Sequence, residues 1–113
     1  KEKYSAVKIN KFIDKVKSSD TVISVCMNRD ESNRVPEWEE IAAVSMAVQN
    51  IWLSCYVNSI GSYWSTPALK DDYAKQSGLN SNQKSLGFFF MGSYKHVETP
   101  KVREGLDSKV EWV

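Results

Sequence analysis

The chain has 113 residues, of which 42% are hydrophobic and 12% aromatic, and its formal net charge is +1. This composition excludes a disordered chain, and the length allows one domain with a modest core. Basic and acidic residues are interspersed, so the sequence shows no basic stripe of the kind that binds nucleic acid. We therefore expect a single globular domain over residues 1–113.

The first apolar pattern indicates an amphipathic helix that ends before residues 18–20, Ser-Ser-Asp. Its apolar positions are Ile9, Phe12, Ile13 and Val16. The pattern begins close to Lys1, and no initiator Met precedes it. We expect that the chain starts at an internal point of a longer sequence.

Residues 21–27, Thr-Val-Ile-Ser-Val-Cys-Met, predict a strand, because they are rich in β-branched residues and carry no charge. A run of this kind is typical of a strand buried on both faces, so we expect it in the centre of a sheet. Residues 28–35 follow as a polar loop. Cys26 in this strand and Cys55 further on are interpreted as small core residues and not as a disulfide, which fits a reducing cytosol.

A long helix is predicted from Pro36 to about residue 58. Proline is tolerated in a first helical turn, and three glutamates near it match the positive end of the helix dipole. The helix carries so little polar surface that we expect it to be covered nearly all round. One face holds Ile41, Val44, Val48, Ile51, Trp52, Cys55 and Tyr56, and Ala42, Ala43, Met46, Ala47 and Leu53 fill much of the other.

This helix could be long enough to cross a membrane, but its polar residues make insertion expensive. These residues are Glu37, Glu39, Glu40, Gln49 and Asn50. We expect a core helix and no membrane partner.

The end of the long helix predicts a change of direction. Gly61 stands where a left-handed C-cap favours glycine, and residues 62–66 are expected to run extended up to Pro67. A short helix is predicted over residues 68–76, with Leu69, Tyr73 and Ala74 facing inward, and Gly78 is expected to end it.

Residues 85–92, Ser-Leu-Gly-Phe-Phe-Phe-Met-Gly, predict a second strand that is buried on both faces. Residues 93–113 show no clear period, and we expect an extended tail that is anchored by Val110 and Trp112. The order of helices and strands predicts an α/β or α+β fold.

Side chains for hydrolytic or zinc chemistry are not apparent in this sequence. His96 has no Cys, Asp or Glu at metal-ligand spacing, which favours a solvated imidazole. The carboxylates of Glu37, Glu39 and Glu40 could act as an acid/base set, but a charged helix N-terminus explains them without a site. A nucleophile elbow, a GxGxxG motif and a P-loop are all absent from the sequence.

Residues 61–66 are the remaining candidate site. A turn there would expose backbone N–H groups beside Tyr63 and Trp64, an arrangement suited to the polar edge and the face of a flat aromatic ligand. The alternative is a loop whose aromatic residues belong to the core, and the spacing alone leaves both open.

Five short stretches, which fall in three runs of the chain, resemble the C-terminal part of the nitroreductase family of FMN flavoproteins. Residues 47–50, Ala-Val-Gln-Asn, and residues 59–64, Ser-Ile-Gly-Ser-Tyr-Trp, are similar to the family patterns "AVQN" and "GxGSxW", with Ser59 in place of the first glycine. Residues 85–94 are similar to the strand motif "vvGfiyLGy". Residues 100–103, Pro-Lys-Val-Arg, and 110–112, Val-Glu-Trp, match the basic and "veW" positions near the end. Together these stretches extend the resemblance over roughly residues 12–113.

The resemblance implies an α+β nitroreductase-like fold with a central mixed sheet, a long buried helix and an intertwined cytoplasmic homodimer. FMN would lie at the subunit interface. Small residues of the long helix would allow the two copies to approach closely, and the tail would extend over the partner. These small residues are Ala42, Ala43, Ser45 and Ala47.

The family transfers hydride from NAD(P)H to FMN and then to a nitroaromatic, quinone or similar acceptor by a ping-pong cycle, so the resemblance implies an oxidoreductase whose cofactor supplies the chemistry. It implies a cofactor site at Gly61, Ser62, Tyr63, Trp64, Ser65 and Thr66, with Lys101 and Arg103 at positions used for the FMN phosphate. No catalytic side chain and no metal are implied.

One departure from the family is large. Relatives have an N-terminal segment, rich in Arg and Ser, that holds the flavin phosphate and ribityl chain, and nothing in this sequence matches it. Two hypotheses follow: the chain is the C-terminal portion of an FMN-dependent NAD(P)H oxidoreductase, or it is a flavin-free dimerisation or interaction module or an inactive fragment of that fold.

Overall fold

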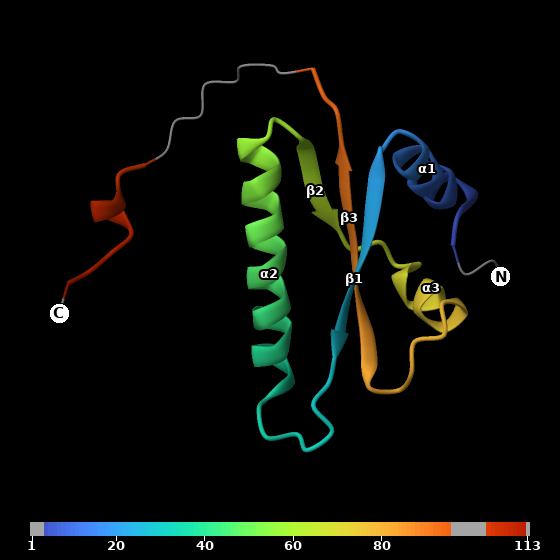
Figure 1. Cartoon of the computed structure of the whole chain (residues 1–113), viewed down its shortest axis with the longest axis horizontal. Coiled ribbons are helices and arrows are strands. Elements are labelled where there is room, and N and C mark those ends of the chain that lie inside the picture. The colour runs from blue at the N-terminus through green and yellow to red at the C-terminus, as the bar shows by residue number, and fades with distance from the viewer. Residues whose placement is uncertain (1–3, 96–103, 113) are drawn as a thin grey trace.

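A computed structural model of the chain describes residues 4–95 and 104–112. In these residues a three-stranded sheet separates two helical layers, with α2 on one face and α1 and α3 on the other (Figure 1). The elements are α1 Ala6–Lys17, β1 Thr21–Asn28, α2 Glu37–Val57, β2 Gly61–Ser65, α3 Lys70–Gln76, β3 Gln83–Gly92 and a short 3-10 helix, Leu106–Ser108. The predicted helices and strands are thus confirmed, and the fold is α+β.

The sheet has the strand order β1-β3-β2, and both pairings are antiparallel. The predicted central position of β1 is therefore wrong, because β1 is an edge strand and β3 lies between the other two. An apolar run indicates cover above and below a strand, and it does not reveal how many neighbours the strand has within the sheet. The mixed sheet implied by the resemblance is likewise not found, since neither strand pairing of the described residues is parallel.

Three consecutive phenylalanines of β3 connect the two layers, because successive side chains of a strand point to opposite faces. The Phe89 ring meets Trp52 of α2 edge to face, with 5.8 Å between centroids. On the other face Phe88 and Phe90 contact Phe12 of α1 at 5.1 and 6.1 Å. All three phenylalanines are buried. The core therefore forms around β3.

Helix α2 covers the sheet with one side. Val48 and Cys55 are buried, and with Val25 and Phe89 they form the centre of the core. The opposite side of the helix is open in the single chain, so the expectation of cover nearly all round is not met within one copy. Tyr56, which was expected on the covered face, is 78% exposed. The other large apolar residues exposed on α2 are Trp38, Met46, Ile51, Trp52, Leu53 and Val57.

Two serines of α2 hydrogen-bond within the helix. Ser45 Oγ donates to the Ile41 carbonyl at 2.8 Å, and Ser54 Oγ donates to the Asn50 carbonyl at 2.9 Å. Each bond reaches back one turn, which is the local bond that serine makes when it lies inside a helix.

The end of α2 corrects the predicted C-cap. The left-handed residue is Ser59, with φ +55°, and not Gly61. The Ile60 N–H bonds to the Cys55 carbonyl at 2.8 Å and the Ser59 N–H to the Tyr56 carbonyl at 3.1 Å, which is a Schellman motif with serine at the position usually held by glycine. Gly61 instead leaves room for a ring, since a Cβ there would lie 2.8 Å from Cδ1 of the half-exposed Tyr94 side chain.

The short helix α3 begins later than predicted, at Lys70, because residues 68–69 form a turn that is closed by a bond from the Lys70 N–H to the Pro67 carbonyl at 3.0 Å. It ends as expected before Gly78, which has φ +74°. The Tyr73 ring contacts Phe88 at 5.0 Å, so α3 joins the same aromatic layer as α1.

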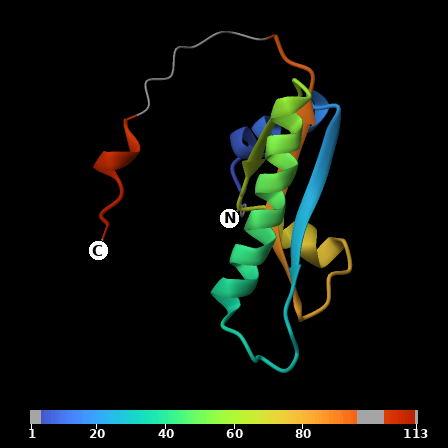
Figure 2. The same cartoon turned by 60° about the vertical axis from the view of Figure 1, so that its left-hand side comes forward.

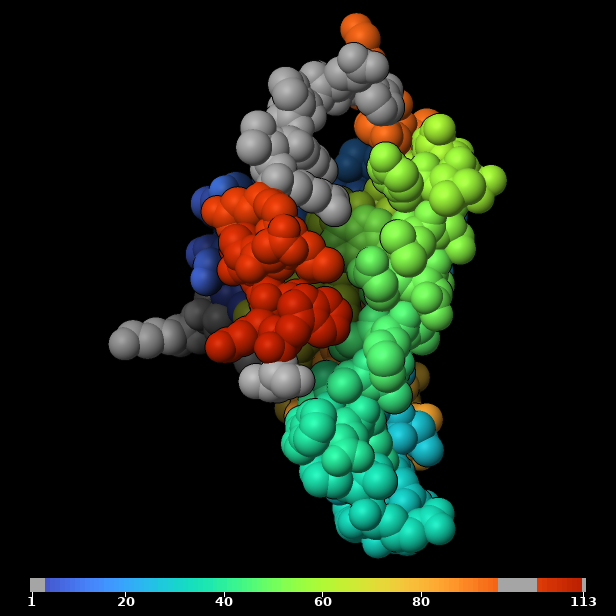
Figure 3. All heavy atoms as spheres, turned by 90° about the vertical axis from the view of Figure 1, so that its left-hand side faces the viewer, coloured from blue at the N-terminus to red at the C-terminus, as the bar shows by residue number. Residues whose placement is uncertain are grey.

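The segment 104–112 lies apart from the sheet in Figures 1 and 2. Leu106 is 69% exposed and Trp112 is 86% exposed, so these side chains pack little on their own chain. Figure 3 views the molecule from this side and shows α2 along the surface. Anchoring of Val110 and Trp112 on a partner copy stays a prediction.

Candidate functional site

Strand β2, Gly61–Ser65, holds five of the eight predicted cofactor-site residues, and it forms one edge of the sheet. It pairs with β3 from Gly61 opposite Gly92 to Ser65 opposite Phe88. Four residue steps separate its ends, which is about 13 Å at the rise of a strand. Since Tyr63 and Trp64 are neighbours, their side chains lie on opposite faces of the sheet. A single flat ligand therefore cannot contact both rings on one face.

Trp64 belongs to the layer between the sheet and α2. Its indole N–H donates to the Leu86 carbonyl at 3.1 Å, and its ring packs against the core cluster of buried residues. The indole thus holds β2 to β3, and its side chain acts in packing.

Tyr63 lies on the other face of the sheet. Its ring stacks on Phe90 with 5.0 Å between centroids and an angle of 11° between planes, and the Lys15 ammonium lies 5.4 Å from the Tyr63 centroid. Burial raises the pKa of the Tyr63 hydroxyl above its ordinary value. Tyr63 therefore stays neutral and links β2 to α1.

Ser65 and Thr66 border an open surface hollow of about 420 Å³ between α1 and residues 65–69, which we call the α1 pocket. This volume falls within the range of about 300–1,000 Å³ that small-molecule sites occupy. Gly61 and Ser62 belong to the opposite end of β2. The structure thus brings two of the predicted site residues, Ser65 and Thr66, to a pocket of ligand size.

Three lysines of α1 line the α1 pocket, and they are not among the site residues predicted from the sequence. Lys8, Lys11 and Lys15 follow one another at spacings of three and four residues, which places them on one face of the helix. The apolar part of the lining includes Phe12 and Leu69. The lysine spacing was visible in the sequence, but the packing of α1 against residues 65–69 was not.

Gly87 fixes the backbone that borders the pocket. The register of β1 against β3 shifts at this point, where Val25 faces Gly87 and Cys26 faces Ser85, so Leu86 is an extra residue in β3. Gly87 has φ +114°, and a Cβ at this position would lie 2.4 Å from the Ser65 carbonyl oxygen. The bulge and the missing side chain together let residues 65 and 66 approach β3.

Tyr4 connects the start of α1 to the same segment, because its hydroxyl donates to the Ala68 carbonyl at 3.2 Å. Residues 65–69 are thus held from β3 on one side and from the start of α1 on the other.

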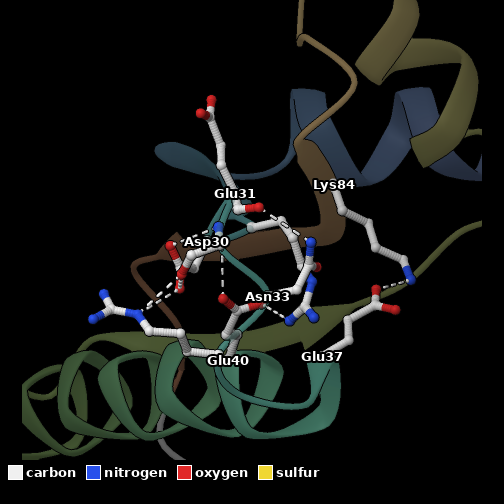
Figure 4. A network of polar contacts seen from close by, with 9 residues as sticks. Asp30, Glu31, Asn33, Glu37, Glu40 and Lys84 are labelled. Atoms are coloured by element: carbon white, nitrogen blue, oxygen red, sulfur yellow. Dashed lines mark hydrogen bonds and ion pairs between the residues drawn. The ribbon is translucent and has the colours of Figure 1, made fainter.

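The carboxylates at the start of α2 belong to a structural network (Figure 4). Glu40 pairs with Arg29 and accepts a bond from the Asp30 N–H at 2.8 Å, and Glu37 pairs with Lys84 at 2.6 Å. The Asp30 N–H and Arg29 hold the pKa of Glu40 below its ordinary value, and the Lys84 ammonium does the same for the pKa of Glu37. The charged helix N-terminus is thus the better explanation, and an acid/base set is not needed.

His96, Lys101 and Arg103 lie outside the described residues. Within the described part, no cluster of His, Cys, Asp or Glu could hold a metal ion, and no helix has the length and apolar character needed to cross a membrane. Cys26 and Cys55 are both free thiols, and Cys55 is buried, as expected for small core residues.

Comparisons with known proteins agree with this fold. The family model described as "Nitroreductase family" matches residues 7–93. The putative NAD(P)H nitroreductase YdjA of Escherichia coli strain K12 is 24% identical over 90 residues, which are 74% of this chain and 49% of YdjA, and YdjA of strain O157:H7 gives the same values. A crystal structure of a nitroreductase-like family protein from Bacillus cereus superposes with a TM-score of 0.76 at 22% identity, over 97% of this chain and 62% of that protein.

The chain therefore spans about half the length of the curated relatives that it matches. The family match covers more than three quarters of the chain, from α1 through β3, and it includes the strand β2 and, apart from Tyr4, the residues that line the α1 pocket. On this match and on the agreement of fold, the chain belongs to the nitroreductase family.

Proposed function

We propose that this chain is part of an FMN-dependent oxidoreductase that passes hydride from NAD(P)H, through FMN, to nitroaromatic, quinone or similar acceptors in a ping-pong cycle. One observation carries the proposal: Ser65 and Thr66, the last two residues of the predicted cofactor site at residues 61–66, border a pocket of about 420 Å³. Relatives named as NAD(P)H nitroreductases support the co-substrate.

The residues of the pocket fit FMN in chemical kind. FMN joins a flat apolar ring with a polar edge to an anionic phosphate. The pocket offers apolar side chains from Phe12 and Leu69, polar groups from Ser65 and Thr66, and lysine ammonium groups. Bound FMN would supply hydride transfer, which no amino-acid side chain provides.

The chain's own groups would bind and orient the cofactor. Strand β2 pairs with β3 on one side, so in the described sheet its other edge has backbone N–H groups that can donate to a ligand. Donors fixed in a sheet need no reorganisation when negative charge develops on a ligand. The positive charge of Lys15, near Tyr63, would also stabilise that negative charge. Lys101 and Arg103 remain the proposed contacts of the phosphate.

We further propose that the working protein is a cytoplasmic homodimer joined along α2. Large apolar side chains on the open side of α2 support this proposal, among them Leu53 at 52% and Tyr56 at 78% exposed. Exposed apolar surface concentrated on one helix is typical of an interaction site. A second copy would cover it, and Trp112 could then pack on the partner.

The same open surface favours a second candidate function. A flavin-free dimerisation or interaction module would need the apolar side of α2 and would have no use for the α1 pocket. FMN binding therefore separates the two candidates.

The test is flavin retention by the purified chain. Backbone donors cannot be removed by mutating side chains, so the informative variant fills the pocket: Ala68 lines it, and Ala68→Trp would place an indole where the ligand would lie. Ala6→Trp, at the exposed first residue of α1, is the matched control.

We expect the chain and Ala6→Trp to keep the visible flavin absorption bands after incubation with FMN and desalting, and Ala68→Trp to lose them. Anaerobic addition of NADH or NADPH should then bleach the bound flavin, and a quinone should restore its colour. A chain that remains colourless after incubation with FMN would refute the cofactor proposal for this chain and leave the interaction module.

A further inference from the structure

We propose that the α1 pocket is an anion site, in which Lys8 and Lys11 bind the acidic group of a ligand whose planar apolar body lies against Phe12 and Leu69. The inference names the ligand class of the site described above, and it rests on the proposed function for the redox role of that ligand. The binding chemistry stands on the pocket alone.

The charges of the pocket have one sign. Three lysines line it and no carboxylate does. Among residues 4–95 and 104–112, no carboxylate forms an ion pair with Lys8, Lys11 or Lys15. Lys70, by contrast, pairs with Asp71 next to it. A cleft lined by charges of one sign concentrates ions of the opposite sign.

The geometry of α1 places the three lysine side chains close together on one face of the helix. Residues three and four apart are neighbours on a helix surface, so like charges at positions 8, 11 and 15 repel. Lys15 is directed to the Tyr63 ring, 5.4 Å from its centroid. Lys8 and Lys11 are left as the cations of the pocket that have no partner among the described residues, and a shared anion would relieve their repulsion.

The remainder of the pocket is suited to an apolar body. Phe12 from α1 and Leu69 from the opposite segment belong to its lining. Phe12 is held in place by ring contacts with Phe88 and Phe90. A fixed aromatic ring beside two cations favours an aromatic acid over a small inorganic ion and over a neutral aromatic compound.

Two sources of this chemistry exist: the phosphate end of FMN and an acidic group on the electron acceptor. A matched pair of probes measures the charge preference itself. The compounds 4-nitrobenzenesulfonate and 4-nitrobenzenesulfonamide have nearly the same shape, and at neutral pH the first is an anion while the second is neutral. Their binding to the chain is measured by calorimetry at low and at high salt, and again after loading with FMN.

The test variant is the double replacement Lys8→Met and Lys11→Met, and the control is Lys17→Met with Lys75→Met. The control removes the same charge from lysines on α1 and α3 that do not line the pocket. A third variant, Lys8→Arg with Lys11→Arg, keeps the charge and should restore binding. Circular dichroism verifies that all variants fold.

We expect the sulfonate to bind at least about tenfold more tightly than the sulfonamide, with a preference that weakens at high salt. The Lys8/Lys11 methionine variant should lose this preference, and the control variant should keep it. If FMN excludes the sulfonate, the cofactor phosphate occupies the site; if both bind together, the acceptor's acidic group does. Either result supports the anion site.

Equal binding of the two probes would overturn the inference, and so would equal losses in the test and control variants. The outcome is separate from that of the proposed function. A chain that prefers the sulfonate but retains no FMN would refute the cofactor proposal and keep the anion site. A chain that retains FMN but shows no preference for the charged probe would refute the anion site and keep the cofactor proposal.

Discussion

Gly87 and Ser65 approach each other so closely that a Cβ on Gly87 would lie 2.4 Å from the Ser65 carbonyl oxygen. The obstacle is backbone, which cannot rotate away as a flexible side chain could. Gly87 also has φ +114°, a conformation that residues with a side chain rarely adopt. We expect Gly87→Ala to lower the free energy of unfolding by about 2–4 kcal/mol. Urea denaturation followed by circular dichroism measures this loss.

Two other glycines separate the causes of that loss. Gly78 has φ +74° with open space around its Cβ position, so Gly78→Ala should cost about 1 kcal/mol from backbone conformation alone. Gly105 has open space and φ −60°, so Gly105→Ala should be nearly neutral. Equal effects at positions 87 and 78 would show that the approach to Ser65 is not a constraint.

Trp64→Phe should destabilise the fold, because it removes the donor that bonds to the Leu86 carbonyl at 3.1 Å. The carbonyl is then left without this partner in a part-buried position, which costs about 1–3 kcal/mol. Trp38→Phe is the control, since Trp38 is 67% exposed, and it should change stability little. Thermal unfolding of both variants is the measurement. A loss no greater at position 64 than at position 38 would contradict the role given to the indole.

Acid should weaken the fold through the network at the start of α2. The pKa of Glu40 and the pKa of Glu37 lie below the ordinary value of 4.5 in the folded chain. The unfolded chain therefore takes up protons first as the pH falls. The stability that these carboxylates provide is complete above their ordinary pKa, and it is lost as the pH falls through the lowered values.

We expect the urea midpoint to fall between about pH 6 and pH 3. Glu40→Gln should lower the midpoint at neutral pH and flatten its dependence on pH. Glu39→Gln, at an exposed neighbouring position, should leave the profile as it is. Parallel profiles for the wild-type chain and Glu40→Gln would refute this account.

If the proposed dimer forms along α2, a charged residue substituted on the open side of this helix should convert the dimer to a monomer. Leu53 is 52% exposed on the open side of the helix, and Leu53→Glu would bury a carboxylate in the interface. Sedimentation should show a dimer for the wild-type chain and a monomer for this variant. Val7→Glu is the matched control, because Val7 is 63% exposed but lies on α1. A monomeric wild-type chain would argue against the dimer.

The helices and strands could be predicted from local patterns, because apolar period and turn residues determine them. The long helix, Glu37–Val57, and the strand with three phenylalanines were evident in this way. The edge position of β1 was not evident from local patterns, since it depends on which strands pair across the sheet. The sequence predicts the left-handed cap at Gly61, because glycine is the residue most often found in this conformation, whereas the structure has it at Ser59.

The candidate site was predictable in its sequence position but not in its three-dimensional form. Ser65 and Thr66 were identified through the family motif, and they do border a pocket. The lysines on the opposite side of that pocket come from α1, 50 or more residues away in the chain. Nothing in a local pattern links Lys11 to Thr66, because their proximity results from the packing of both segments on β3.

The back-bonded hydroxyls of Ser45 and Ser54 affect how α2 can be covered. A polar group that moves from water into a contact normally has to find a new partner there or lose free energy. These two hydroxyls bring their acceptor with them, one helical turn away. An apolar surface could therefore cover these two serines without supplying any matching acceptor for their hydroxyls.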